Sequence, residues 1–442
     1  MPRAPLTAVL RRDAPQAFLG VMGGAVSALV GSLLTARLLD PVERGHYAAI
    51  AVFTTLAVVA LEMGGEVGVL RGMTEAEDAG RSFISGYFAW ILVVSVSGGV
   101  LVTVVGDLAV SWLRPSWLVG AGVAAAVYAA LVARIVSGVL LHDGGLRLLI
   151  AVRTVANCGP VPGCLIFVAT GLTSAVELAA VSFLSQAVLN SVFLYRCRSR
   201  RGTGLDRPER RRPRAWRRDV TRVWDPGNVH LHLLNGSIYA MMRADQMALS
   251  VLGANATLGV YAVTANVAEV AGYLPSALCP LLSRGRPDRP VALRKIIVVL
   301  ALAVAALTPL VYYAIPALYG SDYGAGRTAA LILVPACGIF AVGRLVQGVE
   351  LRDPAKRPAL TRIALASAAI EFTVMWLLGD RGVVAAAWAC AIGYTTYTVW
   401  VALVFRTNLL PRPAAWPFRL PRTRTGDGWR TAPADKSAGH RQ

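Results

Sequence analysis

The chain has 442 residues, of which 55% are hydrophobic and only 16% are charged, and its mean hydropathy is +0.56. Soluble globular domains contain about 25% charged residues, so this composition excludes an ordinary soluble protein. The formal net charge of +19 is compatible with nucleic-acid binding until the basic residues are placed along the chain.

Hydrophobic windows long enough to cross a bilayer, which takes about 20 helical residues, recur along most of the sequence. We predict an all-α integral membrane protein with about twelve transmembrane helices. The predicted spans are 14–38, 46–69, 83–105, 117–141, 148–170, 175–195, 228–252, 256–282, 295–318, 327–349, 360–378 and 382–405.

The distribution of the 44 Lys and Arg residues predicts the orientation of these spans. With the N-terminus inside, four arginines lie at membrane depth, five lie in or beside outside loops, and the other 35 lie in inside loops, the N-terminal segment or the tail. The five outside residues are Arg37, Arg44, Arg114, Arg327 and Arg381. Basic residues concentrate on the cytoplasmic side of membrane proteins. We therefore expect a multi-pass plasma-membrane protein with both termini cytoplasmic, attracted to anionic lipid, and no binding of nucleic acid.

A strongly polar segment divides the spans into two groups of six. It covers 196–225 and contains twelve arginines. We predict an N-terminal six-helix bundle (1–195), a basic cytoplasmic linker (196–226), a C-terminal six-helix bundle (227–410) and a disordered basic cytoplasmic tail (411–442). The linker is either a solvated tether or a surface that touches anionic headgroups.

The two groups of spans share a short sequence repeat. "LLDPVERGHYAAIAVF" begins at Leu38, and "VLGANATLGVYAVTANV" begins at Val251. Both place Gly-x-Tyr-Ala between the first and second spans of their group, so that Gly45 corresponds to Gly259. Because six spans is an even number, the two copies share one orientation, as in a parallel repeat about an axis along the membrane normal. This predicts two matching bundles around a central cavity.

Three motifs carry a resemblance to a known family. They are "ARLLDPVERGHYAA", "RADQMAL…LGVYAVTANVAEV…LPSAL" and "LYGSDYGAG". Over about residues 14–405 the chain resembles the polysaccharide transporters of the multidrug/oligosaccharidyl-lipid/polysaccharide exporter superfamily. The resemblance implies a flippase that moves a polyprenyl-diphosphate-linked oligosaccharide across the bacterial plasma membrane by alternating access, with glycosyltransferases of the same pathway as partners. A drug exporter or lipid II flippase of the same superfamily is the alternative.

Charged residues at membrane depth are the candidate site residues, since each costs about 2.5–3.5 kcal/mol to insert unless it faces a polar interior or a partner. We expect the arginines to line the cavity and bind substrate phosphate through bidentate contacts. The acids would balance that charge or couple transport to H⁺ or Na⁺. The arginines are Arg134, Arg153, Arg243 and Arg344; the acids are Glu62, Asp245, Glu269 and Glu371.

Sequence spacing suggests how some of these charges pair. Arg243 and Asp245 are two residues apart and point to different sides of a helix, so each needs another partner. Glu269 is the nearest candidate for Arg243, either as a partner exchanged during transport or in a fixed ion pair. Glu62 and Glu66 share one helix face, and form either a proton-coupling pair or two side chains that reach the cytoplasmic interface.

The sequence specifies the partners of the other charged residues at membrane depth less closely. Glu371 is a possible partner for Arg344 from the neighbouring span. Arg153 and Arg344 either line the cavity or extend to the membrane interface, whereas Arg134 lies deeper. No acid occurs in the first span between Gln16 and Leu38, which argues against drug/cation antiport.

Enzyme motifs are missing from the sequence. It contains no Walker motif, zinc-ligand spacing or nucleophile elbow, and the predicted outside loops are short. We therefore predict no catalytic residues, no metal site and no cofactor beyond a coupling ion. Its six cysteines are interpreted as small packing residues. A membrane enzyme of polysaccharide assembly and a scaffold that docks glycosyltransferases are the alternatives from other classes.

Overall fold

A computed structural model describes residues 6–62, 91–104, 117–142, 154, 158–199, 226–273, 290–351, 353–378 and 381–405. The described residues form helices and short connections, with no strand among them. The chain divides into a unit that spans Met1–Thr407 and a C-terminal unit, Asn408–Gln442. All the helices below belong to the first unit.

Seven described helices are long and apolar enough to cross a membrane, and three shorter apolar stretches accompany them, at Met22–Leu38, Ile91–Val104 and Pro160–Thr170. The prediction of a helical multi-pass membrane protein is confirmed. The division into two separate bundles stays a prediction, and so do the roles of the linker and the tail, which lie almost entirely outside the described residues.

The N-terminal half contains one described helix for each of its six predicted spans. They are α1 (Leu6–Leu38), α2 (Pro41–Leu61), the helix Ile91–Val104, α5 (Trp117–His142), α7 (Pro160–Thr170) and α8 (Ala175–Ser199). Helix α8 packs against α5 and α7, and α1 packs against α7. Helix α7 begins at Pro160, where proline suits a first helical position because its missing N–H has no partner there.

The C-terminal half likewise has a helix in each predicted span. They are α10 (Pro226–Val251), α11 (Asn255–Ala268) continued by the 3₁₀ helix η1 (Glu269–Gly272), α13 (Pro290–Tyr319), α14 (Gly326–Glu350), α15 (Arg357–Leu378) and α16 (Val383–Phe405). Two short 3₁₀ helices, η2 (Ser321–Tyr323) and η3 (Pro354–Lys356), lie in connections. Helix α15 packs against α10 and α16, and α14 packs against α16 and α13.

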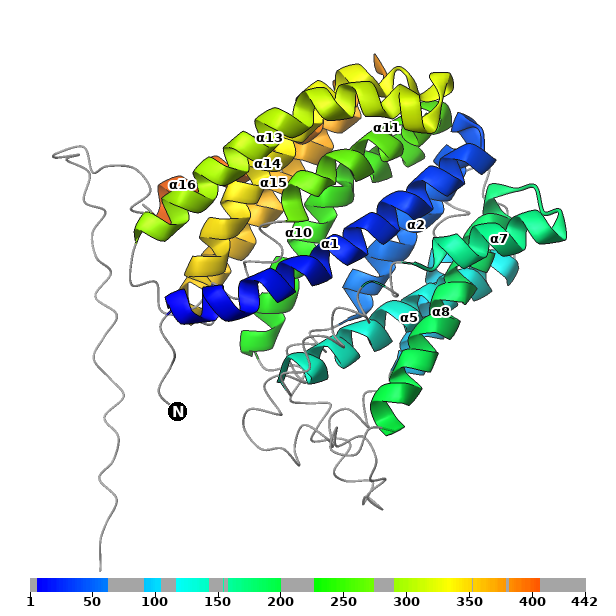
Figure 1. Ribbon diagram of the computed structural model, residues 1–442, viewed down its shortest axis with the longest axis horizontal. Helices are drawn as coiled ribbons and strands as arrows, with labels where there is room; N and C mark the ends of the chain where they lie inside the picture. The colour runs from blue at the N-terminus through cyan, green and yellow to red at the C-terminus, as the bar shows by residue number, and fades with distance from the viewer. Residues whose placement is uncertain are drawn as a thin grey trace, which may run out of the picture. The chain divides into compact units, whose positions relative to one another are not determined.

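Helix α2 joins the two halves, since it packs against both α10 and α11 (Figure 1). The contact with α11 is reciprocal. A Cβ atom on Gly45 would overlap the Asn255 carbonyl at the start of α11, and one on Gly259 would overlap the Pro41 carbonyl at the start of α2. The two glycines that correspond in the sequence repeat therefore allow the two helix starts to cross with their backbones in contact.

The start of α2 differs from the prediction. The helix begins at Pro41, ahead of the predicted start at residue 46, because Asp40 caps it: its side chain accepts a hydrogen bond of 2.8 Å from the Glu43 N–H. Such a cap satisfies a backbone donor that would otherwise be unpaired. Arg44, which we expected in an outside loop, consequently lies in the first turns of α2, and only 3% of it is exposed.

Further contacts close the same end of the molecule. We call it the outer end, because the predicted orientation places it outside; it comprises the α1–α2, α10–α11 and α13–α14 connections. The Arg37 Nε–H donates to the Leu318 carbonyl at 2.8 Å. The Tyr323 hydroxyl in η2 lies 3.3 Å from the Ala36 carbonyl and 3.2 Å from the Leu39 carbonyl. The C-terminal half is thereby tied to the end of α1.

Candidate functional site

An ion pair between Arg134 of α5 and Glu62, the C-cap residue of α2, lies where the halves meet. The Arg134 guanidinium also lies over the ring of Tyr239 from α10, 5.5 Å from its centroid. Glu62 is buried, whereas 23% of the Arg134 side chain is exposed. Arg134 therefore contacts protein from both halves and remains partly exposed. Glu66, the other member of the expected acidic pair, lies outside the described residues.

A second ion pair joins Arg243 on α10 to Glu269 at the start of η1. Their nitrogen and oxygen atoms meet at two points, 2.6 Å and 3.4 Å apart. About a fifth of each side chain remains exposed, 20% for Arg243 and 17% for Glu269. The pairing with Glu269 rather than Asp245 agrees with the helical spacing, and the two-point geometry is the one a guanidinium also offers to a phosphate.

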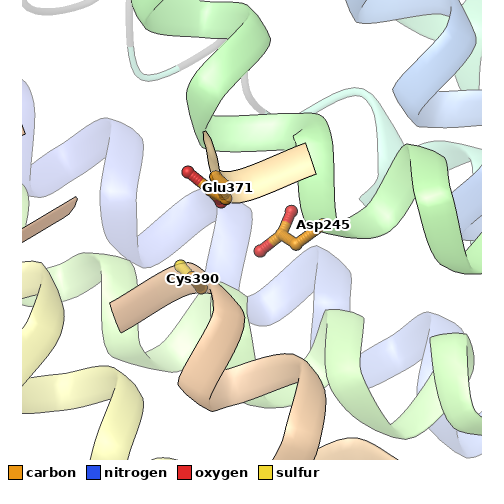
Figure 2. Close-up of side chains that lie close together, drawn as sticks. All are labelled: Asp245, Glu371 and Cys390. Atoms are coloured by element: carbon orange, nitrogen blue, oxygen red, sulfur yellow. The ribbon is translucent and has the colours of Figure 1, made fainter. Parts of the chain in front are cut away.

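The third feature is a buried cluster of Asp245, Glu371 and Cys390, whose ligand atoms all lie within 4.8 Å of one another. Figure 2 shows the three side chains converging from α10, α15 and α16. Asp245 is held by the Tyr261 hydroxyl, which donates a short hydrogen bond, and by the Gln246 N–H at 2.7 Å.

Glu371 is completely buried, and neither of its carboxylate oxygens accepts a hydrogen bond of normal geometry from the described residues. Gly393 of α16 makes room for it, because a Cβ atom there would overlap the carboxylate. Pairing of Glu371 with Arg344 is wrong: Glu371 lies beside Asp245 and Cys390 instead. The reason is helix packing, since α15 buries its face against α10 and α16, whereas Arg344 lies on α14.

The residues of this cluster could hold a proton or a cation. Two carboxylates so close together in a dry site cannot both remain ionised without compensation. A proton shared between them, or a cation held by their oxygens, would supply it. Carboxylate oxygens suit a hard cation such as Na⁺, whereas the Cys390 thiol is a soft ligand. The set of donors therefore fits a proton better than a metal ion.

The other candidates are placed as follows. Arg344 is half-buried on α14, and Arg153 lies outside the described residues. Cys164 and Cys337 are buried, as expected of packing residues. Sequence reasoning missed the contribution of Cys390 to the acidic cluster, and no local signal reveals it, because its neighbours come from two other helices.

No family model matches the sequence, and no curated protein matches it. Solved structures do match the fold. The inward-facing conformation of a multidrug resistance MATE family transporter of the MOP superfamily aligns with 16% identity and a TM-score of 0.58, covering 89% of this chain and 94% of that one.

The lipid II flippase MurJ in its inward closed conformation aligns with 10% identity and a TM-score of 0.66, covering 88% and 87%. A MOP superfamily transporter from Pyrococcus furiosus, described as having a binding pocket of reversed polarity, aligns with 15% identity and a TM-score of 0.51, covering 92% of this chain and 96% of that one. At these identities the likeness is one of fold. The fold expected from the superfamily resemblance is confirmed.

Proposed function

We propose that this protein is a flippase or exporter that moves a polyprenyl-diphosphate-linked oligosaccharide across the plasma membrane by alternating access between its two halves. One observation carries the proposal. In a fold that solved transporters share, Arg134 on α5 and Arg243 on α10 form ion pairs and still keep about a fifth of each side chain exposed, 23% and 20%.

Those arginines are suited to an anionic cargo because their carboxylate partners can be exchanged. A fully buried pair would resist exchange, since separating the charges leaves an uncompensated ion. A partly exposed pair can instead transfer the guanidinium from Glu62 or Glu269 to a substrate phosphate with the same bidentate geometry. The released carboxylate then limits the net charge inside the transport path.

The cluster of Asp245, Glu371 and Cys390 would supply the coupling. We propose that it is loaded with one proton in one conformation of the halves and releases it in another, with Na⁺ as the alternative ion. Tyr261 lies on α11, at the position that corresponds to Tyr47 in the sequence repeat, and donates a hydrogen bond to Asp245. A change in the charge of the cluster would therefore change the position of α11. Helix α11 contacts the N-terminal half at α2.

Lipid II is the second candidate cargo, because MurJ shares this fold with a TM-score of 0.66. It too is a polyprenyl diphosphate that carries sugars, so the role of the arginines is unchanged. A cationic drug fits less well, since arginines would repel it and the first span has no acid between Gln16 and Leu38. Docking of glycosyltransferases or anionic lipid to the basic linker is a separate part of the proposal.

Transport in proteoliposomes tests the cargo. Purified protein is reconstituted with a fluorescent polyprenyl-diphosphate oligosaccharide or with lipid II, and translocation is followed by loss of access to an impermeant quencher. We expect Arg134→Ala and Arg243→Ala to slow translocation at least about tenfold, the effect of losing one charge-assisted contact. The matched control is Arg362→Ala, since Arg362 is exposed on α15. Normal rates in both Arg134→Ala and Arg243→Ala would rule out phosphate binding by these residues.

Imposed gradients test the coupling in the same vesicles. We expect Asp245→Asn and Glu371→Gln to abolish stimulation of transport by a proton gradient, while Asp322→Asn, an exposed acid in η2, leaves it intact. Stimulation of transport by a sodium gradient alone would identify Na⁺ rather than H⁺ as the coupling ion. Full proton stimulation in Glu371→Gln would remove the cluster from the coupling mechanism.

A further inference from the structure

Arg44 is a third buried arginine, and its environment differs from those of Arg134 and Arg243. Only 3% of Arg44 is exposed. Its Nε–H is buried and has no hydrogen-bond partner among the described residues. One Nη lies 3.5 Å from the Ser32 hydroxyl, and the guanidinium lies 5.0 Å from the centroid of the Tyr47 ring.

Carboxylates close to Arg44 in sequence are engaged elsewhere. Asp40 accepts the hydrogen bond that caps α2. One oxygen of Glu43 accepts a hydrogen bond of 2.8 Å from the Ala175 N–H, and the other lies 3.2 Å from His46 Nδ1. No described acid forms an ion pair with Arg44, although the other two arginines each have one.

The groups around Arg44 are hydroxyls and an amide from both halves of the molecule. The Ser32 hydroxyl of α1 also accepts a hydrogen bond of 3.2 Å from the Asn266 amide of α11. Tyr319 of α13 and Tyr323 of η2 are close enough to act electrostatically on the guanidinium. Hydroxyls and an amide can donate hydrogen bonds, and together with a guanidinium and without a carboxylate they form a set that suits an anion better than a cation.

Burial of a guanidinium without an ion-pair partner is costly, and the Tyr47 ring and the long hydrogen bond to Ser32 offset only part of that cost, so the presence of Arg44 at the outer end requires an explanation. We propose that Arg44 and Ser32 form an outer anion site for a phosphate or diphosphate group, which opens when Tyr319 and Asn266 move away with the C-terminal half. While the outer end is closed, the unpaired charge opposes closure. When the halves separate there, the guanidinium gains an anion or water.

This inference rests on the proposed function for its role in transport, because the anion would be the cargo diphosphate as it leaves Arg134 and Arg243, the central arginines of the proposed path. A site at the outer end would take over the phosphate contacts there and so lower the barrier to release. The anion chemistry itself depends only on the residues around Arg44.

Thermal unfolding of the purified full chain in detergent, titrated with inorganic diphosphate, tests the site. Diphosphate that bound the basic linker equally well in folded and unfolded chains would not raise the unfolding temperature. The titration uses an Arg134→Gln/Arg243→Gln background, which removes the central arginines. We expect diphosphate still to raise the unfolding temperature there, and adding Arg44→Gln to weaken its apparent affinity about 10- to 100-fold.

Two further variants sharpen the comparison. Arg362→Gln removes an exposed arginine from α15, away from the outer-end contacts, and should leave the diphosphate effect unchanged. Arg44→Lys keeps the positive charge but loses the paired N–H donors of the guanidinium. It should therefore bind diphosphate with an affinity between those of the background protein and Arg44→Gln. Without ligand, Arg44→Gln should unfold at a higher temperature than its parent, because it removes a desolvated charge; a fall would show that the folded state compensates that charge already.

The remaining outcomes decide the proposal and the source of the anion. A diphosphate effect that is absent from the background protein, or that survives Arg44→Gln, would overturn the outer site, whatever the transport assays show. Tighter binding of geranyl diphosphate than of inorganic diphosphate would identify a lipid-linked anion, and equal binding a free one. Because the central arginines are absent, failure here is distinguishable from failure of the proposed cargo.

Discussion

Adding one methyl group at Gly45 should shift the outer end toward its open state. In Gly45→Ala the new Cβ atom would overlap the carbonyl oxygen of Asn255, which belongs to the backbone of α11. No rotamer change can relieve a clash with backbone, so α2 and α11 must separate. The overlap is between the two halves, and each helix itself can accept alanine.

The size of the shift follows from the cost of overpacking. Forcing an extra methyl group into a packed interface typically costs about 1–3 kcal/mol. If the open state relieves the clash, the ratio of open to closed molecules rises about 5- to 150-fold. Gly259→Ala should act in the same direction, since its Cβ atom would overlap the Pro41 carbonyl.

Accessibility of a residue behind this contact provides the assay. Asn266, which hydrogen-bonds to Ser32 across the halves, is replaced by cysteine, and its labelling by an impermeant maleimide added outside intact cells is timed. The parent chain without Asn266→Cys gives the background from native cysteines. We expect Gly45→Ala to accelerate labelling by at least about fivefold, the lower end of the expected shift.

Gly272→Ala is the control, because a Cβ atom on Gly272 meets nothing within 4 Å. Labelling in Gly45→Ala and Gly259→Ala no faster than in Gly272→Ala, at equal expression, would show that the reciprocal contact does not hold the outer end closed. Faster labelling in all three would point to a general loss of packing, and would refute the same reasoning.

Two further perturbations follow from single contacts. Glu62→Gln leaves the Arg134 charge without its ion-pair partner and should lower the free energy of unfolding by about 1–3 kcal/mol, between the values for exposed and buried pairs. Glu62→Leu with Arg134→Leu should recover most of this loss in thermal unfolding; a double variant no more stable than Glu62→Gln would contradict the pairing. Tyr261→Phe deprives Asp245 of a hydrogen-bond donor and should destabilise by about 1–3 kcal/mol. It should also change the ion dependence of transport, and an unchanged dependence would separate Tyr261 from the coupling cluster.

Local properties of the sequence predicted where the helices of this protein lie. Hydropathy located a helix in each predicted span, because a segment must satisfy its own backbone within lipid and therefore carries its signal in its own composition. The divergence of Arg243 and Asp245 was also predictable, since it depends only on helical periodicity. The Gly45 and Gly259 repeat was visible in the same way, although its purpose was not.

Partnerships between helices were decided by the tertiary structure alone. Glu371 faces Asp245 and Cys390 rather than Arg344 because α15 packs against α10 and α16, and nothing in the composition of α15 specifies that face. The Asp40 cap places Arg44 in the first turns of α2, but its burial depends on the packing of α2 against α11. Side chains that meet across more than a hundred residues of chain are brought together by close packing, which no local pattern in a single sequence records.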